Sequence, residues 1–303
     1  MSKKVCEVKL FREGDPRMNV AAGGRWACFA LYCCGVFTIP LTLLWDHTGT
    51  LVGLFLSGAF LFGLAFHAPN RISRALGVTR LSAAEVPKLH AALTEYCRRL
   101  EMPLPQLGVM ESPSLNIATY GFFPKHRFLV LTRGLLQTLP REELNALVAR
   151  QLTYLWHGDA FGDTWLTQFL RCFSFLVFGE EQPPSHSPSP RPYSIKVFVR
   201  QFLLYPLALF PLFLLRGRNT QEGLALDLKT IRMTQKPQAL AEGLRKVEAF
   251  HERVAFHTAL SFRHLFLVPP FTWDPLGRVV LEAQKTTERI EALGKLTRTI
   301  TMT

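Results

Sequence analysis

Two long uncharged stretches near the start of the chain stand out in its pattern of hydrophobic and polar positions. They cover residues 26–45 and 48–66, and only Asp46 and His47 lie between them. About twenty apolar residues in a helix span the hydrocarbon layer of a bilayer. Because the connection is so short, the two helices are expected to run in opposite directions. The pattern therefore predicts a transmembrane hairpin over residues 26–68.

Basic residues flank this hairpin on both sides. An arm over residues 1–25 carries several lysines and arginines, and Arg71, Arg74 and Arg80 follow the second stretch. Cytoplasmic segments of membrane proteins gather Lys and Arg, so both ends of the hairpin are expected in the cytoplasm. The long polar arm and the lack of a small-residue cleavage site disfavour a cleaved signal peptide.

Residues 82–160 have the pattern of a folded α+β unit. Apolar residues recur at helical spacing over residues 86–100, and a strand-like run covers residues 128–134. Glu142 and Glu143 then form an acidic first turn, which is typical of the start of a helix.

Two weaker apolar segments lie within residues 161–215, on either side of a linker at residues 180–194. The linker is too rich in Pro and Ser to fold. Arg171 interrupts the first segment, and Arg200 lies near the start of the second. These segments are expected to be the third and fourth spans, with the linker outside the cytoplasm because basic residues follow the second one at once. Residues 216–303 are expected to be a helical, cytoplasmic C-terminal part.

Composition agrees with a membrane protein. The chain is 48% hydrophobic, and its formal net charge is +12. Such a basic chain can bind nucleic acid, but its charges flank the spans and are not interleaved with aromatic residues. We therefore expect the lipid bilayer as a partner and no nucleic acid. The six cysteines include no C-x-x-C pair, which predicts reduced thiols.

Four local motifs follow one another along the chain. They are MPLPQLGVMESPSLNIATYG (residues 102–121), FLVLTRGLLQTLPREELNALVARQLTYLWHGD (128–159), LALDLKTIRMTQKPQALAEGLRKV (224–247) and TERIEAL (287–293). Their order, with the spans around them, resembles the HtpX family of membrane zinc metallopeptidases, relatives of the CAAX prenyl proteases. The resemblance implies a mainly α membrane protein of a bacterial inner membrane. It would have four transmembrane helices and a cytoplasmic, metallopeptidase-like α+β domain of the gluzincin type.

The residues that carry the family's chemistry are replaced in this chain. The family binds zinc through H-E-x-x-H on a helix, where the Glu activates a water molecule. Here the matching positions are Arg150, Gln151 and Tyr154, and Gly223 stands where the family has its third ligand, a Glu. Arg has no lone pair to offer, a Gln amide is no base, and Tyr is a rare zinc ligand. The family's later "THPP" motif is matched by AQKT at residues 283–286. We expect no bound zinc.

Asp227 matches an Asp that supports a ligand His in the family. Without that His, a buried carboxylate needs another partner. We expect Arg150 to pair with Asp227, or otherwise with Glu222, while Gln151 and Tyr154 fill the remaining space. The alternative is that Arg150 turns to solvent or to lipid phosphate.

His157, Asp159 and Asp163 offer a different metal site, since they follow Arg150 along the same helix and just beyond it. A useful zinc site needs three converging ligands. The alternative interpretation of these residues is a solvated helix end.

The resemblance also implies a strand that holds an extended substrate beside the active-site helix. The corresponding residues are expected to be an edge strand: Phe128, Leu129, Val130, Leu131 and Thr132.

Two functions follow from the sequence. The first is a catalytically inactive pseudopeptidase that acts as a binding or regulatory module for a membrane protein or a paralogous subunit. The second is an active membrane metalloendopeptidase with a reassigned metal site.

Overall fold

The fold is described from a computed structural model, which covers residues 16–123, 126–178, 199, 220–254, 256 and 258–270. Several predicted parts lie outside these residues. They are most of the N-terminal arm, the Pro/Ser-rich linker, nearly all of the fourth span, and the chain after residue 270 with its AQKT and TERIEAL motifs.

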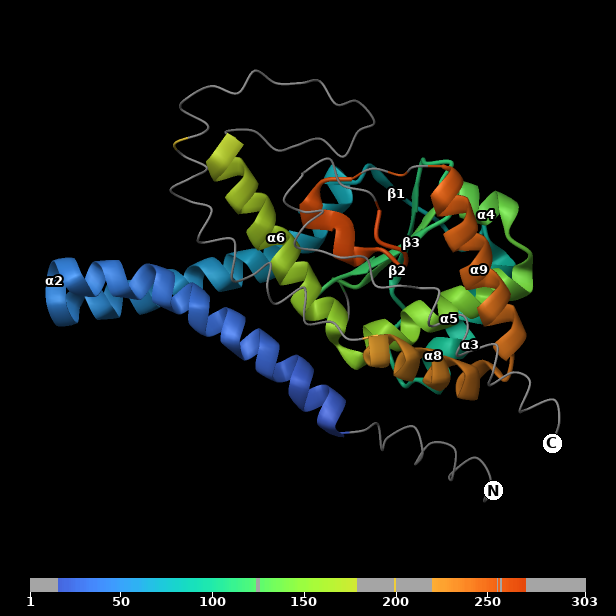
Figure 1. The fold of residues 1–303 in the computed structure, drawn as a ribbon, viewed down its shortest axis with the longest axis horizontal. Coiled ribbons are helices and arrows are strands. Elements are labelled where there is room, and N and C mark those ends of the chain that lie inside the picture. The colour runs from blue at the N-terminus through green and yellow to red at the C-terminus, as the bar shows by residue number, and fades with distance from the viewer. Residues whose placement is uncertain are drawn as a thin grey trace.

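Helix α2 (Pro16–Ala75) forms the predicted hairpin, because its backbone leaves the helical conformation at Trp45 and Asp46. The two legs lie side by side near the tip of the hairpin, which projects away from the rest of the molecule, and they diverge towards the domain (Figure 1). Within the described part of the chain, only the stretch Ala27–Gly63 is long and apolar enough to cross a membrane. Large apolar side chains on both legs are exposed, including Leu43 and Phe55. Such a surface suits lipid better than water.

Small residues let the two legs of α2 approach closely. A Cβ atom added at Gly53 would lie 2.6 Å from Thr38 Cα, and one added at Gly49 would lie 1.9 Å from the carbonyl oxygen of Leu41. Ser57 continues this row, and its hydroxyl donates to the carbonyl oxygen of Gly53 at 2.7 Å. Helices pack closely in membranes through this spacing of small residues.

A four-stranded sheet follows in the order β1-β2-β4-β3. Its strands are β1 (Val78–Arg80), β2 (Gln106–Met110), β3 (Ile117–Tyr120) and β4 (Phe128–Thr132). β2 and β4 are parallel, whereas the two outer strands pair antiparallel with their neighbours.

The prediction that Phe128–Thr132 is an edge strand is wrong. β4 pairs with β2 on one side and with β3 on the other, so β1 and β3 are the outer strands. All five residues of β4 are buried. A continuous apolar run of this kind is typical of an internal strand.

Both faces of the sheet are covered. Leu129 and Leu131 of β4 join a core cluster with helices α3 (Pro87–Arg99) and α5 (Arg141–His157). Phe128 and Val130 point to the other face, where they meet the end of α2 and the short helix η2 (Leu260–Leu265). Successive strand residues alternate between faces, so a strand buried on both sides must be apolar throughout.

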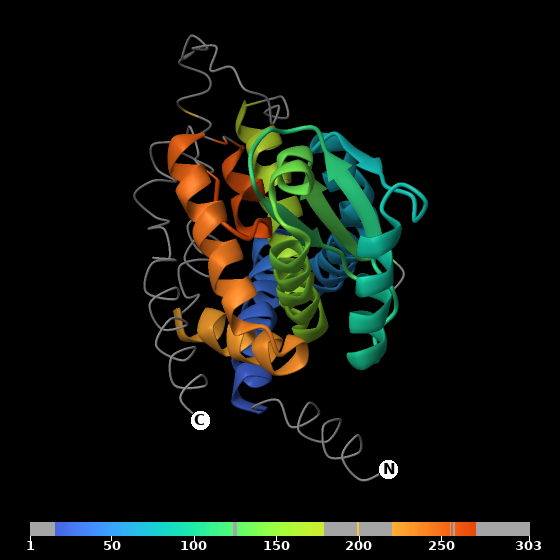
Figure 2. The same cartoon turned by 90° about the vertical axis from the view of Figure 1, so that its right-hand side faces the viewer.

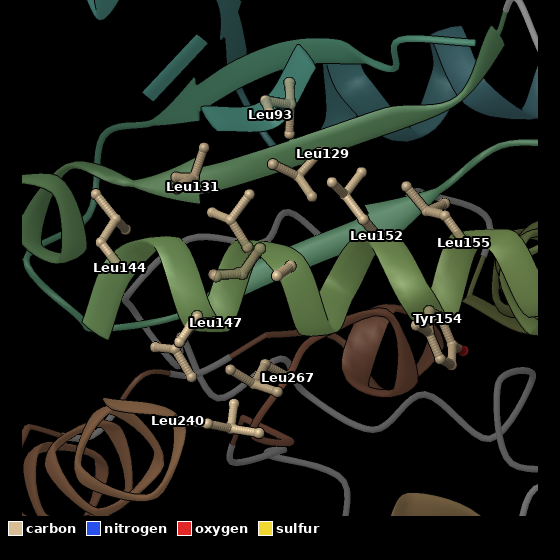
Figure 3. Packing of buried hydrophobic residues seen from close by; sticks show 14 of the residues in the cluster. Leu93, Leu129, Leu131, Leu144, Leu147, Leu152, Tyr154, Leu155, Leu240 and Leu267 are labelled. Carbon is tan, nitrogen blue, oxygen red and sulfur yellow. The ribbon is translucent and has the colours of Figure 1, made fainter. Parts of the chain in front are cut away.

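Helix α5 lies at the centre of the domain. The sheet residues Leu129 and Leu131 lie on one side of it, and Leu240 and Leu267 lie on the other (Figure 3). Helices α8 (Thr220–Thr234) and α9 (Pro237–Arg253) also contact α5 (Figure 2). The helix follows the short α4 (Arg133–Thr138) and ends at Gly158, whose positive φ of 84° suits glycine.

Helix α6 (Asp159–Phe178) includes the segment expected to be the third span. Its apolar residues Leu166 and Leu170 cluster with Phe29 and Cys33 on the first leg of α2. Its buried polar residues face the protein, and the guanidinium of Arg171 lies over the ring of Phe262 in η2. An Arg within an apolar segment is expected to face protein or water.

We predict that Gly53→Ala weakens the hairpin by about 1–3 kcal/mol, because its methyl group must push against the backbone at Thr38. Thermal unfolding of the purified protein in detergent measures the effect. Gly58→Ala is the matched control, because nothing lies within 4 Å of the added atom. The control should keep or raise the melting temperature, since alanine favours a helix. Equal effects of the two substitutions would contradict the close approach of the legs.

Candidate functional site

Arg150 and Asp227 form a buried ion pair between α5 and α8. The Nε–H of Arg150 donates to Oδ1 of Asp227 at 3.1 Å. The Arg150 side chain is 8% exposed and that of Asp227 is 0% exposed. The pair expected from the sequence is therefore present, and Arg150 does not turn to solvent. A buried charge is stable only with such a partner.

Tyr154, one turn further along α5, contacts a second carboxylate. Its hydroxyl donates to Oδ2 of Asp163 on α6, and both residues are buried. Asp163 also brings η2 into the site, because its carbonyl oxygen lies 3.0 Å from Nε2 of His264. The same His264 nitrogen lies 2.9 Å from the hydroxyl of Thr167. Polar contacts thus join α5, α6 and η2.

Further polar side chains of α5 and α8 are buried near these contacts in sequence. Gln151 is 2% exposed, so it fills buried space as expected. Thr153 and Thr230 connect the helices through their hydroxyls, at 3.3 Å. Gly223 lies near the start of α8 and is partly exposed. The side chain of Glu222 lies outside the described residues.

At the end of α5, Lys229 of α8 packs against Trp156 and His157. Its Nζ lies 3.6 Å from the centre of the Trp156 ring and 3.3 Å from Nε2 of His157. Burial and the nearby ammonium lower the pKa of His157 to about 4. Burial lowers the pKa of Lys229 to about 8. His157 is therefore neutral at pH 7, and its Nε2 atom contacts the ammonium group of Lys229.

Comparison with known proteins identifies the family. A model of peptidase family M48 matches residues 83–266, which is more than half of the chain. The chain belongs to peptidase family M48.

Its relatives place it among the HtpX-type members of family M48. The protease HtpX homologue of Nostoc sp. is 25% identical over 272 residues, which are 86% of this chain and 91% of the relative. Protease HtpX homologue 1 of Streptomyces coelicolor is 26% identical over 291 residues, 93% of each chain. The crystal structure of S. mikatae Ste24p is also similar, with a TM-score of 0.49, 15% identity, and coverage of 91% of this chain and 66% of that chain.

Family M48 consists of metallopeptidases, but the residues at this site do not fit a zinc ion. Zinc is bound by neutral His, thiolates and carboxylates, usually with three protein ligands at a catalytic centre. At the position that the sequence resemblance aligns with the family's first ligand, this chain has the guanidinium of Arg150, whose fixed charge repels a dication. Across the described residues, no three His, Cys, Asp or Glu side chains lie close enough together to hold a metal ion.

Of the three residues of the alternative metal site, the two whose side chains are described have other partners. His157 lies against Lys229, whereas Asp163 accepts a hydrogen bond from Tyr154. The side chain of Asp159 lies outside the described part of the structure.

Sequence reasoning missed His264 and Lys229. His264 is far from α6 in sequence, and no motif connects it with Asp163. Lys229 lies two residues after Asp227 and therefore on a different side of the helix, so the predicted pair gave no signal for its contact with His157.

We predict that Arg150→Leu destabilises the protein by about 3–5 kcal/mol, because it leaves Asp227 buried without its cation. Denaturant unfolding in detergent, followed by tryptophan fluorescence, measures the change. Arg98→Leu is the matched control. Arg98 pairs with Glu95, but its side chain is 71% exposed, so its loss should cost under about 1 kcal/mol. An Arg150→Leu protein as stable as the control would contradict a structural role for the buried pair.

Proposed function

We propose that this chain is a catalytically inactive HtpX-like pseudopeptidase that acts as a membrane-bound binding or regulatory module. The proposal depends on one observation: the residues aligned with the family's zinc ligands make contacts that stabilise the fold. Arg150 pairs with Asp227, and Tyr154 donates to Asp163. A peptidase needs those positions for a metal and its activated water.

Retention of the peptidase fold supports a binding role. The core around α5 is formed by apolar residues from the sheet and from helices α3, α5, α8 and α9. A fold that keeps its core and replaces its catalytic groups can still present a surface to another chain. The partner proposed is another membrane protein or a paralogous subunit, because the apolar surface of the α2 hairpin suits a bilayer.

We predict that the purified protein carries well under one zinc ion per chain and that chelators leave its melting temperature unchanged, because the fold lacks ligands to lose. Elemental analysis and thermal unfolding with and without EDTA provide the measurements. Arg150→His/Gln151→Glu/Tyr154→His/Gly223→Glu is the positive control, since it restores the family's ligand set. Stoichiometric zinc in the parent protein, with cleavage of a peptide substrate, would instead favour the metalloendopeptidase with a reassigned site.

We further propose four membrane spans in a bacterial inner membrane, with the peptidase-like domain in the cytoplasm. The charge distribution around the hairpin supports this orientation. α6 and the apolar segment before Arg216 would supply the third and fourth spans, and the Pro/Ser-rich linker at residues 180–194 would lie on the other side.

A cysteine at Ser187, in the middle of that linker, tests the orientation. In a variant whose native cysteines are replaced, Ser187→Cys should react with a membrane-impermeant maleimide in intact cells. A cysteine at Ser82, in the loop before α3, is the control and should react only after lysis. The opposite pattern would reverse the topology, because the reagent reaches only the outer face.

A further inference from the structure

A groove lies between the start of α3 and the start of α5, and we call it the α3–α5 groove. Its volume is about 320 Å³. Its lining comes from residues 85–89 at the start of α3, residues 136 and 139 in and after α4, and residues 141, 144 and 145 of α5. Pockets for small molecules have volumes from about 300 Å³ upwards. Arg150 and Tyr154 do not line this groove, so it is separate from the site described above.

The buried part of the lining is apolar. Leu89, Leu139 and Leu144 belong to the core cluster around α5. Val86 and Leu136 pack against this cluster but are only half-buried. The main core is therefore incompletely covered in the groove, and the burial of such surface favours binding of an apolar group.

The exposed rim of the groove is basic. Lys88 and Arg141 are both exposed, and neither forms an ion pair with another of the described residues. Glu142, the carboxylate next to Arg141 in the chain, pairs instead with Lys236 at 2.8 Å. Both rim cations are thus available to a negatively charged group.

Glu85 contributes the carboxylate of the lining, and it already has a local role. The N–H of Ser82 donates to Oε2 of Glu85 at 2.6 Å, and this hydrogen bond lowers the pKa of Glu85. Two cations against one anion leave the lining with a net charge of +1. The first turn of α3 has no acidic residue, so the helix dipole adds to the positive potential. The groove therefore favours an anion over a cation.

The position of the groove indicates where its ligand comes from. In Figure 1, the tip of the hairpin lies on one side of the molecule, whereas α3 and α4 lie on the opposite side. A lipid held in the bilayer around the hairpin would not reach the groove. A ligand of the groove therefore enters from the aqueous phase.

We propose that the α3–α5 groove binds a water-soluble monocarboxylate that carries a short apolar chain. Arg141 and Lys88 hold the carboxylate, since a guanidinium can form two parallel hydrogen bonds with it. The chain lies against the apolar part of the lining. At about 30 Å³ per water-sized group, the groove holds roughly ten non-hydrogen atoms. This inference goes beyond the proposed pseudopeptidase function and does not rest on it.

Fluorine NMR of the full-length protein in lipid nanodiscs measures the binding. The probe is hexanoate with a trifluoromethyl group at its apolar end, and the control probe is the corresponding alcohol, which has the same chain and no charge. Empty nanodiscs give the line broadening that is due to lipid, which is subtracted for each probe. The protein should bind the carboxylate at least about tenfold more tightly than the alcohol, because only the carboxylate forms charge-assisted hydrogen bonds.

Two arginine variants assign the binding to the groove. Arg141→Gln should weaken binding of the carboxylate at least about tenfold and leave binding of the alcohol unchanged. Arg245→Gln is the matched control, because Arg245 is exposed on α9 and does not line the groove, and it should leave both affinities unchanged. Both replaced side chains are exposed, so both variants should fold as the parent does.

A shorter probe tests the apolar part of the lining. Butanoate with the same trifluoromethyl end has two fewer methylene groups to bury, so it should bind about tenfold more weakly than the hexanoate. Equal affinities of the two carboxylates would mean that surface charge alone attracts them, which would overturn the proposal.

Three further results would also overturn it. They are equal binding of the carboxylate and the alcohol, equal effects of Arg141→Gln and Arg245→Gln, and no broadening beyond that of empty nanodiscs. These measurements concern neither zinc nor peptide cleavage. Failure of the groove proposal is therefore distinguishable from failure of the proposed function.

Discussion

Asp227 places a carboxylate where solvent does not reach it, and the arrangement around α5 depends on how that charge is matched. In a metal centre, a buried carboxylate of this kind is balanced by the metal cation and by hydrogen bonds to its ligands, which come from several helices. Here Arg150 supplies the cation from the neighbouring helix. A guanidinium cannot activate water as a metal does, so this contact stabilises the fold without supplying metal chemistry.

The hydrogen bond from Tyr154 to Asp163 connects a different pair of helices, α5 and α6. Tyr154 joins α5 to α6 through Asp163, and α6 in turn packs against the first leg of α2. Helix α5 is therefore connected through polar contacts to α6 and α8, and through α6 to the hairpin. In this arrangement, α5 joins the peptidase-like core to the hairpin proposed to anchor it in the membrane.

Features set by local pattern could be predicted from the sequence, whereas features set by long-range pairing could not. The hairpin follows from two uncharged runs and a short connection, and α5 follows from its acidic start and apolar periodicity. The Arg150–Asp227 pair was predictable because the resemblance aligned both helices and a buried carboxylate demands a cation. The full strand order was not predictable, because it depends on crossovers that leave no local signal. A clue existed in the unbroken apolar run of β4, which favours an internal strand over an edge. The hydrogen bond from the N–H of Leu267 to the carbonyl oxygen of Ile117 in β3 brings together residues 150 positions apart, which periodicity cannot reveal.

The Arg150–Asp227 ion pair links α5 to α8, and a double-mutant cycle tests this role most directly. The cycle compares unfolding free energies in detergent for Arg150→Leu, Asp227→Leu and the double variant. Each single change removes one charge of the buried pair and keeps the other, whereas the double change removes both. The account predicts that the double variant is more stable than the sum of the single losses by at least about 2 kcal/mol. Additive losses would contradict it, because they would mean that Arg150 and Asp227 do not depend on one another.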